Sequence, residues 1–432
     1  MLSALPGGTI LSIALLASVV SERPAASQDG APIRELPRPT GDLPVGVVTL
    51  HLSDHTRQEP LRLGGGVREL MIDVWYPAEP AEGLPHPYFD PRAFNDAASA
   101  DRLRGLLRAA YDEIREGRVR THAKQRVPFS RSVRRAPLLI FSHGGGEARE
   151  TYRAQLEDLA SHGFVVAAIS HTHEAVLTIF PDGRQIPLAP GRWPSPTSSA
   201  FEGLPPSEEA NPDRLQWWAS DIRFVIDELV KIDDARSSTL PFAGRLDGSR
   251  MGAFGHSAGG QAAAHACQIE PRLRACLNQD GLAAFAPYYL DSREWGMTQS
   301  FMLIVRNTPR EQPSPEELAA MHMTLEQAQQ LLAKLAARQD ASLRRTGGGA
   351  YRVLIDAAKT THADFGDLPF LQSKTPSEAE RHAQILESVR TVTRAFFDKS
   401  LKRSRPPLLE GRGLPKFVEA VQAFEPAQPP AR

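Results

Sequence analysis

The chain has 432 residues and a formal net charge of −1, with 41% hydrophobic and 23% charged residues. Its length allows more than one domain, although α/β folds often run as long in a single domain. The charge is nearly balanced, no basic stripe in the sequence indicates nucleic-acid binding, and no acidic block indicates a disordered tail. We therefore expect a globular protein that does not bind nucleic acid.

The first residues have the pattern of a targeting segment. An apolar run at 9–20 is followed by the small residues of 24–27, where a cleavage site fits. The run is too short to span a bilayer, and no basic residue precedes it, since Arg23 is the first. We predict a signal peptide at 1–27 and export to the periplasm or the medium. The alternative is an apolar, disordered N-terminus.

Strand and helix patterns alternate along the rest of the chain. Short apolar runs predict strands at 45–52, 70–76, 137–142, 164–169, 250–255, 274–279, 300–305 and 351–355. Helical spacing of apolar residues predicts helices at 94–116, 150–162, 214–232, 258–267, 315–345 and 376–397. This alternation is typical of an α/β fold with a doubly wound, mostly parallel sheet.

The same pattern suggests a division of the chain. Residues 28–44 are rich in proline and polar residues and are expected to form a lead-in linker. A single α/β domain is expected at 45–400, with helical insertions at about 92–127 and 312–346. The proline-rich segment 401–432 is expected to be a C-terminal tail.

The stretch Gly255-His256-Ser257-Ala258-Gly259 fits the G-x-S-x-G nucleophile elbow. It lies between a predicted buried strand and an alanine-rich helix, which is the context that the motif requires. Glycine is needed on both sides because the strand and the helix approach each other closely at the turn. Ser257 is therefore the candidate nucleophile.

A serine hydroxyl needs a base and a site for the developing negative charge. In a fold with this elbow the base follows the last strand, and His362 is the histidine between that predicted strand and the terminal helix. The amide of Ala258, after the nucleophile, is one expected oxyanion donor. The other is expected in the glycine turn after strand 137–142, with Gly145 as the best candidate.

Three carboxyl groups compete for the role of the triad acid. Asp280 ends the strand after the elbow helix, where side chains point into the crevice of an α/β sheet. Glu311 lies several residues beyond the next strand, and Asp364 follows His362 too closely to reach behind the ring. We predict Asp280, which gives the order Ser257, Asp280, His362.

The remaining metal- and thiol-bearing residues do not form a motif. Cys267 and Cys276 have no metal-type spacing, and they are either a disulfide across a short connection or two separate buried thiols. His171 and His173 would share one face of a strand, as a metal pair does, but no third ligand is evident. We predict no metal and no cofactor.

Several of these motifs together resemble the platelet-activating factor acetylhydrolase family, meaning the plasma and type II enzymes and their bacterial relatives. The resemblance covers about residues 43–397. Its motifs are F-S-H-G-G-G at 141–146, D-L-A-S-H-G-F-V-V-A-A at 158–168, G-H-S-A-G-G at 255–260 and T-H-A-D-F at 361–365. The chain departs from the family at Gly145 and Gly146, where the animal enzymes carry bulkier residues, and in the insertion at 315–345.

The resemblance implies an α/β-hydrolase fold and a serine carboxylic ester hydrolase for short acyl groups, working without a metal. It implies the triad Ser257, Asp280 and His362 and the oxyanion amides of Gly145 and Ala258. The expected partner is a small-molecule or lipid ester, with phospholipid sn-2 esters among the candidates. The alternatives are an amide or peptide hydrolase on the same triad and a catalytically dead binding protein. The helical insertions fit lids with weak membrane contact or an ordinary packed helical pair, and the oligomeric state is left open.

Overall fold

The structure is a computed structural model, and it describes residues 33–61, 65–190, 212–235, 239–281, 297–307, 318 and 324–425. The predicted signal peptide at 1–27 lies outside these ranges. Parts of the predicted linker, of the second insertion and of the tail lie outside them as well. Within the described part, no helix is long and apolar enough to cross a membrane.

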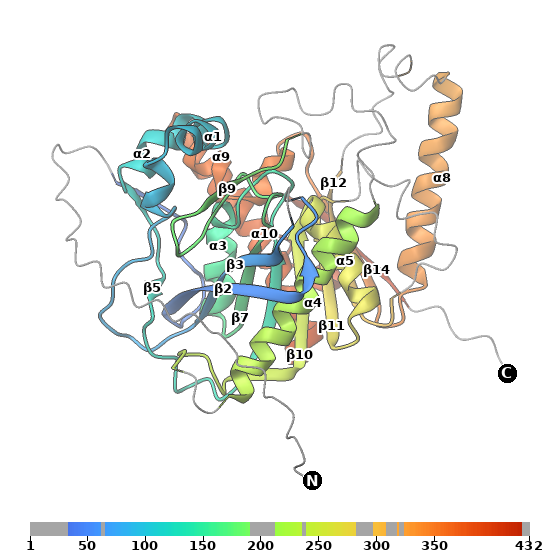
Figure 1. Cartoon of the computed structure of the whole chain (residues 1–432). Helices are drawn as coiled ribbons and strands as arrows, with labels where there is room; N and C mark the ends of the chain where they lie inside the picture. Colours follow the sequence, from blue (N-terminus) through green and yellow to red (C-terminus); the bar gives the residue numbers. More distant parts are fainter. Residues whose placement is uncertain are drawn as a thin grey trace, which may run out of the picture.

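A ten-stranded sheet organises the molecule (Figure 1), in the order β14-β13-β12-β11-β10-β6-β7-β3-β2-β5. Its strands are β2 (Val45–Gln58), β3 (Val67–Pro77), β5 (Lys124–Gln125), β6 (Ala136–Ser142), β7 (Val165–Ser170), β10 (Leu246–His256), β11 (Leu273–Gln279), β12 (Ser300–Arg306), β13 (Ala350–Ile355) and β14 (Val418–Phe424). The strands from β13 to β7 in this order run parallel. β3 pairs antiparallel with both β7 and β2, and β14 pairs antiparallel with β13. The predicted mostly parallel sheet is confirmed.

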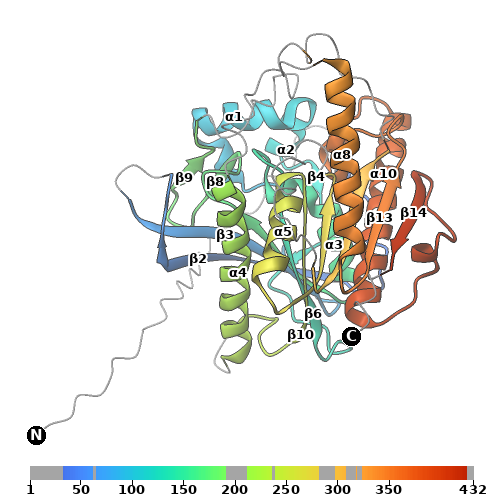
Figure 2. The same cartoon turned by 90° about the vertical axis from the view of Figure 1, so that its right-hand side faces the viewer.

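Helices cover both faces of this sheet (Figure 2). On one face lie α4 (Pro212–Asp234), α5 (Ala258–Ile269) and α8 (Leu325–Arg344), and on the other α3 (Arg153–Ser161) and α10 (Pro376–Lys402). Successive side chains of a strand point to opposite faces. The apolar residues of β6 therefore pack in two hydrophobic cores, one on each face of the sheet. Ile140 packs in the core that contains Ile222 of α4, and Phe141 in the core that contains Leu156 of α3 and Val389 of α10.

A third, smaller core lies beside the loop that follows β6. It brings together apolar residues of α1 (Ala97–Leu107) and α2 (Tyr111–Arg115), Leu371 of α9 (Leu368–Leu371) and Ala148 of that loop. The remaining short elements are β1 (Arg34–Glu35) with β4 (Val119–Arg120), β8 (Leu177–Ile179) with β9 (Gln185–Pro187), and the 3-10 segments η1 (Pro91–Phe94), η2 (Arg108–Ala110), η3 (Arg149–Tyr152), η4 (His362–Phe365) and η5 (Pro407–Glu410). The first predicted insertion therefore packs against Ala148 in the loop that follows β6.

The sheet extends further along the chain than the expected range 45–400. β14 lies in the segment that was expected to be a tail, and it pairs with β13 from Ala350 to Ile355. Its sequence V-E-A-V-Q-A-F does not alternate cleanly between apolar and polar residues, so it carries no clear strand signal. Pairing with an existing strand edge, rather than local pattern, makes this segment a strand.

Candidate active site

The serine of the elbow occupies the sharp turn that the motif predicts. β10 ends at His256 and α5 begins at Ala258, with Ser257 between them at φ 54° and ψ −121°. Non-glycine residues rarely adopt this backbone region, and they are held there only when the surroundings require it. Ser257 is partly exposed, whereas the residues on either side of it are buried.

The two flanking glycines of the elbow are both required by close packing. A Cβ on Gly255 would collide with the backbone of Gly259 and with the carbonyl oxygen of Ser142, at the end of β6. A Cβ on Gly259 would collide with the carbonyl oxygens of Ser142 and His143. The strand, the helix and the start of the glycine turn are therefore in backbone contact, which places the turn beside Ser257.

His362 and Asp280 come together although 82 residues separate them. The Nδ1 atom of His362, at the start of η4, lies 2.7 Å from Oδ2 of Asp280, just after β11. A carboxylate at Nδ1 leaves Nε2 as the proton acceptor. The His362 ring lies 4.4 Å from the ring of His256, the neighbour of Ser257, measured between centroids.

The histidine is accessible and its acid is not. The His362 side chain is 34% exposed, whereas that of Asp280 is 2% exposed. Within the described residues no hydrogen bond joins the Ser257 hydroxyl to His362. Such contacts are often long before substrate binds and tighten in the reacting complex.

Asp280 has a second partner that sequence reasoning missed. The Nε atom of Arg306, at the end of β12, donates to Asp280 Oδ2 at 2.9 Å. Burial raises the pKa of Asp280, but the hydrogen bond and charge of His362 and the charge of Arg306 outweigh it and hold the pKa below its usual value. The signal that would have found Arg306 is its place at the end of the strand next to β11.

Asp364, one of the two competing carboxyl groups, has partners other than His362. Asp364 accepts hydrogen bonds from the amide and hydroxyl of Thr361, at 2.7 and 2.9 Å, and pairs with His382 of α10. It therefore anchors η4 rather than orienting the imidazole of His362. Glu311 lies outside the described residues.

The glycine turn leaves one of its amides without a partner. Three amides near it are engaged: Gly144 with the Tyr152 hydroxyl at 3.1 Å, Gly146 with the Glu174 carbonyl at 3.1 Å, and Glu147 with the Gly144 carbonyl at 3.1 Å. The amides of Gly145 and Ala258 make no hydrogen bond to any described residue. These are the two donors expected from the sequence, and free amides beside the nucleophile can stabilise an oxyanion.

The two cysteines form a disulfide, which was one of the two alternatives left open by the sequence. Cys267 near the end of α5 is bonded to Cys276 within β11, and both are buried. α5 begins directly after Ser257 and β11 ends directly before Asp280. The disulfide therefore ties together the two elements that carry the candidate nucleophile and acid.

His171, the first member of the histidine pair, has both ring nitrogens engaged. Nδ1 lies 2.8 Å from Oδ2 of Asp221, and Nε2 lies 3.0 Å from the Ser142 hydroxyl. Among the residues that the structure describes, no three His, Cys, Asp or Glu side chains form a group that would hold a metal ion. The buried imidazole of His171 therefore has a structural use.

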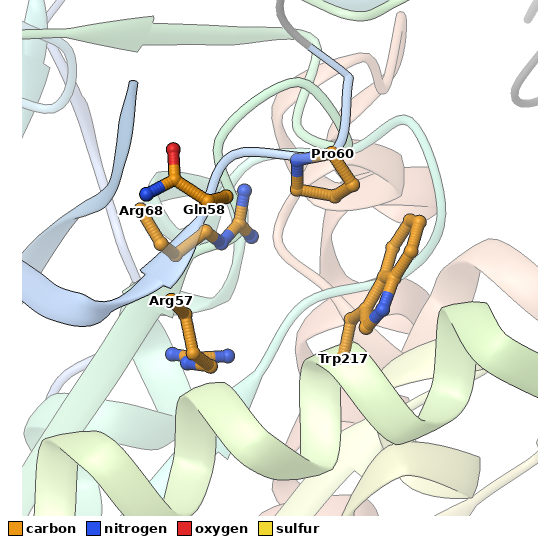
Figure 3. Close-up of a pocket in the computed structure, with 5 residues that line it drawn as sticks. All are labelled: Arg57, Gln58, Pro60, Arg68 and Trp217. Atoms are coloured by element: carbon orange, nitrogen blue, oxygen red, sulfur yellow. The ribbon is translucent and has the colours of Figure 1, made fainter. Parts of the chain in front are cut away.

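A pocket of about 190 Å³ lies between the start of β3 and α4 (Figure 3). It is lined by Arg57, Gln58, Pro60, Arg68 and Trp217. The guanidinium groups of Arg57 and Arg68 are already paired with the carboxylates of Asp54, Glu59 and Asp221. None of the five predicted site residues lines this pocket, and its charges are compensated, so it is not assigned to the candidate active site.

Known families and proteins resemble this chain in sequence. A family model described as platelet-activating factor acetylhydrolase, isoform II, matches residues 31–187, which include the glycine turn but end before the elbow. The platelet-activating factor acetylhydrolase of Cavia porcellus is 27% identical over 255 residues, or 55% of this chain and 53% of that protein. A probable 1-alkyl-2-acetylglycerophosphocholine esterase of Arthroderma benhamiae is 27% identical over 145 residues, or 34% and 31%. The chain spans about half the length, or less, of these curated relatives.

A solved structure matches more of the chain. It is a ferulic acid esterase from Streptomyces cinnamoneus, 26% identical, with a TM-score of 0.63 over 87% of this chain and 95% of that one. This match and the mostly parallel sheet confirm the predicted α/β-hydrolase fold. The family model ends at residue 187, before the elbow, the acid strand and the histidine loop.

Proposed function

We propose that this chain, which is similar in sequence to the platelet-activating factor acetylhydrolases, is a serine carboxylic ester hydrolase. The observation that carries the proposal is one of geometry. Ser257 occupies the strained elbow, the ring of His362 in the His362–Asp280 pair packs against its neighbour His256, and the amides of Gly145 and Ala258 have no partner in the described structure. These are the parts that acyl transfer through a serine needs.

In the proposed reaction Ser257 Oγ attacks the ester carbonyl carbon while His362 Nε2 takes its proton. The carbonyl oxygen becomes an oxyanion and accepts hydrogen bonds from the amides of Gly145 and Ala258. Asp280 holds the imidazole in the required tautomer and stabilises the imidazolium. His362 then protonates the leaving alcohol, and water attacks the acyl-enzyme with the same histidine as base.

The acyl group is proposed to be short. The curated relatives are named for acetyl ester hydrolysis, and phospholipid sn-2 esters are the lipid candidates that this suggests. A second candidate is an aromatic acyl group, because the ferulic acid esterase is matched over most of both chains. Amide hydrolysis on the same residues and a binding protein without activity remain the competing functions.

A panel of esters measured on purified protein tests the proposal. We expect hydrolysis of acetyl and butyryl esters well above that of palmitoyl esters, no loss in a chelator, and a much slower reaction on the matching amide. A feruloyl ester in the same panel decides between the two acyl classes. Ser257→Ala should abolish all of these activities, and a folded wild-type protein that cleaves no activated ester would contradict the proposal.

We further propose that the protein is exported. The Cys267–Cys276 disulfide supports this, because disulfides persist mainly in oxidising compartments. The mass of the mature protein after expression of the full chain in a secreting host tests it. Loss of a leader near residue 27 is expected, and retention of the intact N-terminus in the cytosol would contradict it.

A further inference from the structure

The peptide unit between Gly144 and Gly145 carries the first proposed oxyanion donor. Glycine has little conformational preference of its own, so contacts from outside must fix the turn. The Gly144 carbonyl lies 2.7 Å from Nδ1 of His143 and accepts the Glu147 amide at 3.1 Å. Because a peptide unit is planar and trans, fixing this carbonyl also fixes the direction of the Gly145 N–H.

The other side of Gly144 is held by Tyr152. The hydroxyl of this tyrosine accepts the Gly144 amide at 3.1 Å. It also lies 2.7 Å from Nδ1 of His256 and donates to the carboxyl group of Glu147. Tyr152 has no exposed surface, and its ring packs 4.8 Å from that of Phe141, measured between centroids.

The protons of this cluster are assigned from the hydrogen bond that Tyr152 donates to Glu147. A tyrosine hydroxyl has one proton to donate and two lone pairs to accept with. Burial lowers the pKa of His256 well below its usual value, so its imidazole is neutral and has one N–H. With Tyr152 donating to Glu147, the Gly144 amide and the His256 Nδ1–H both donate to the tyrosine oxygen. Loss of the hydroxyl would leave three groups without this partner.

We propose that Tyr152 is a positioning residue of the oxyanion hole. Its hydroxyl joins the glycine turn to His256, the residue immediately before Ser257, and so holds the Gly145 amide at a fixed place relative to the nucleophile. The inference rests on the proposed function, since an oxyanion forms only if Ser257 attacks an ester. Tyr152 acts through Gly144 and His256 and is not itself a donor to the substrate.

The decisive variant is Tyr152→Phe, which keeps the ring and removes the hydroxyl. Removing an oxyanion donor lowers kcat by about 10²- to 10³-fold. A Gly145 amide that is present but poorly oriented should therefore lower kcat by about 10- to 100-fold. KM should stay within about threefold, since the lost contact acts mainly in the transition state. A trifluoromethyl ketone, whose adduct with Ser257 places an oxyanion in the same site, should bind more weakly by a similar factor.

Tyr76→Phe is the matched control. Tyr76 is also fully buried, and its hydroxyl donates one hydrogen bond, at 2.7 Å, to the Val127 carbonyl. It lies at the end of β3 away from the glycine turn, next to Gly46 of β2. Tyr76→Phe likewise removes a buried hydroxyl, with one hydrogen bond instead of three, but it should keep kcat within about twofold and change only thermal stability.

The variant Glu147→Gln tests whether kcat depends on the hydrogen bond that holds the Tyr152 hydroxyl or on the negative charge of Glu147. The glutamine carbonyl still accepts the proton of Tyr152, so this variant should keep kcat within about threefold of the wild type. A Glu147→Gln enzyme as slow as Tyr152→Phe would overturn the inference, because charge and not anchoring would then control the rate.

The remaining outcomes are also distinct. A Tyr152→Phe enzyme that matches Tyr76→Phe in kcat, or that changes only in KM, would overturn the inference and leave the proposed function standing. A folded wild-type protein without esterase activity would overturn the proposed function and this inference with it.

Discussion

The described part of the chain contains two Ser–His–Asp arrays, and we propose that only one of them reacts. The open array consists of Ser257, His362 and Asp280, and the sealed array of Ser142, His171 and Asp221. The His–Asp contacts are almost equal, at 2.7 Å in the open array and 2.8 Å in the sealed array. In the sealed array the serine even lies 3.0 Å from the histidine. Hydrogen-bond geometry alone therefore does not identify a catalytic triad.

The surroundings separate the two arrays. The three residues of the sealed array have no exposed surface. Trp218 stacks on the His171 ring at 4.0 Å between centroids, and Asp221 is paired with the guanidinium groups of Arg57 and Arg68. Ser142 lies at the end of the regular strand β6, whereas Ser257 occupies a strained, partly exposed turn. Access and a strained turn are what the sealed array lacks.

The largest expected difference is between the two aspartates. Asp280→Asn should lower kcat by about 10⁴ while the protein stays folded, because a neutral partner favours the wrong imidazole tautomer. Asp221→Asn should keep kcat within about threefold but unfold at a lower temperature, since Arg57 and Arg68 would lose a buried counter-charge. Rates and thermal unfolding of both variants check this.

The alternative acid belongs to the same experiment. Glu311→Gln should lose little activity if Asp280 orients the histidine. If Glu311→Gln is the crippling change and Asp280→Asn remains nearly active, the acid has been assigned wrongly.

The next largest expected effect is the loss of stability on removing the disulfide, which joins the two elements next to Ser257 and Asp280 of the open array. Replacing both cysteines by alanine should lower the free energy of unfolding by about 2–3 kcal/mol, as expected for a short closed loop. Chemical denaturation of the wild type and the double variant measures this value. No change in stability would show that packing of α5 on β11 holds these elements without the bond.

The sealed array should make the fold sensitive to acid. Burial lowers the pKa of His171, and its hydrogen bond to Asp221 offsets this only in part. In the unfolded chain this histidine binds a proton near pH 6.5, whereas in the native state it stays neutral. The free energy of unfolding is therefore highest above that pH and falls as the pH drops below it. His171→Asn should flatten the fall in stability between pH 6.5 and 5 by up to about 1.4 kcal/mol per pH unit. Equal slopes in the two proteins would contradict a buried neutral His171.

The smallest expected effect comes from the serine of the sealed array. Ser142→Ala removes one hydrogen bond to His171 and should cost about 1 kcal/mol of stability. Its kcat should stay within about twofold of the wild type. Loss of activity comparable to that of Ser257→Ala would show that the two arrays have been distinguished incorrectly.

Residues whose role is set locally could be predicted from the sequence. The elbow depends on glycines two positions either side of Ser257, and the βαβ order of strand 137–142, glycine turn and strand 164–169 is readable as a pattern. Asp280 and His362 could be predicted because each follows a predicted strand, and the end of a strand determines where the residues after it lie in the sheet. The histidine–aspartate contact then followed from topology, and the structure has it.

Residues whose role depends on distant partners could not be predicted. His171 contacts Asp221 over 50 positions of sequence. Tyr152 contacts His256 over 104 positions, with nothing in its local sequence to mark it. β14 likewise becomes a strand by pairing with β13. In each case a partner distant in sequence, and not the local sequence pattern, determines the contacts of the residue or the secondary structure of the segment.

Covalent labelling tests the central claim, that the open array alone carries a reactive serine. The wild-type protein is treated with a fluorophosphonate probe, and the modified residue is identified by peptide mass spectrometry. Ser142→Ala and Ser257→Ala serve as matched variants of the two serines. We predict a single adduct on Ser257 that persists in Ser142→Ala and is absent in Ser257→Ala. Labelling of Ser142, or an unchanged adduct in Ser257→Ala, would contradict the account.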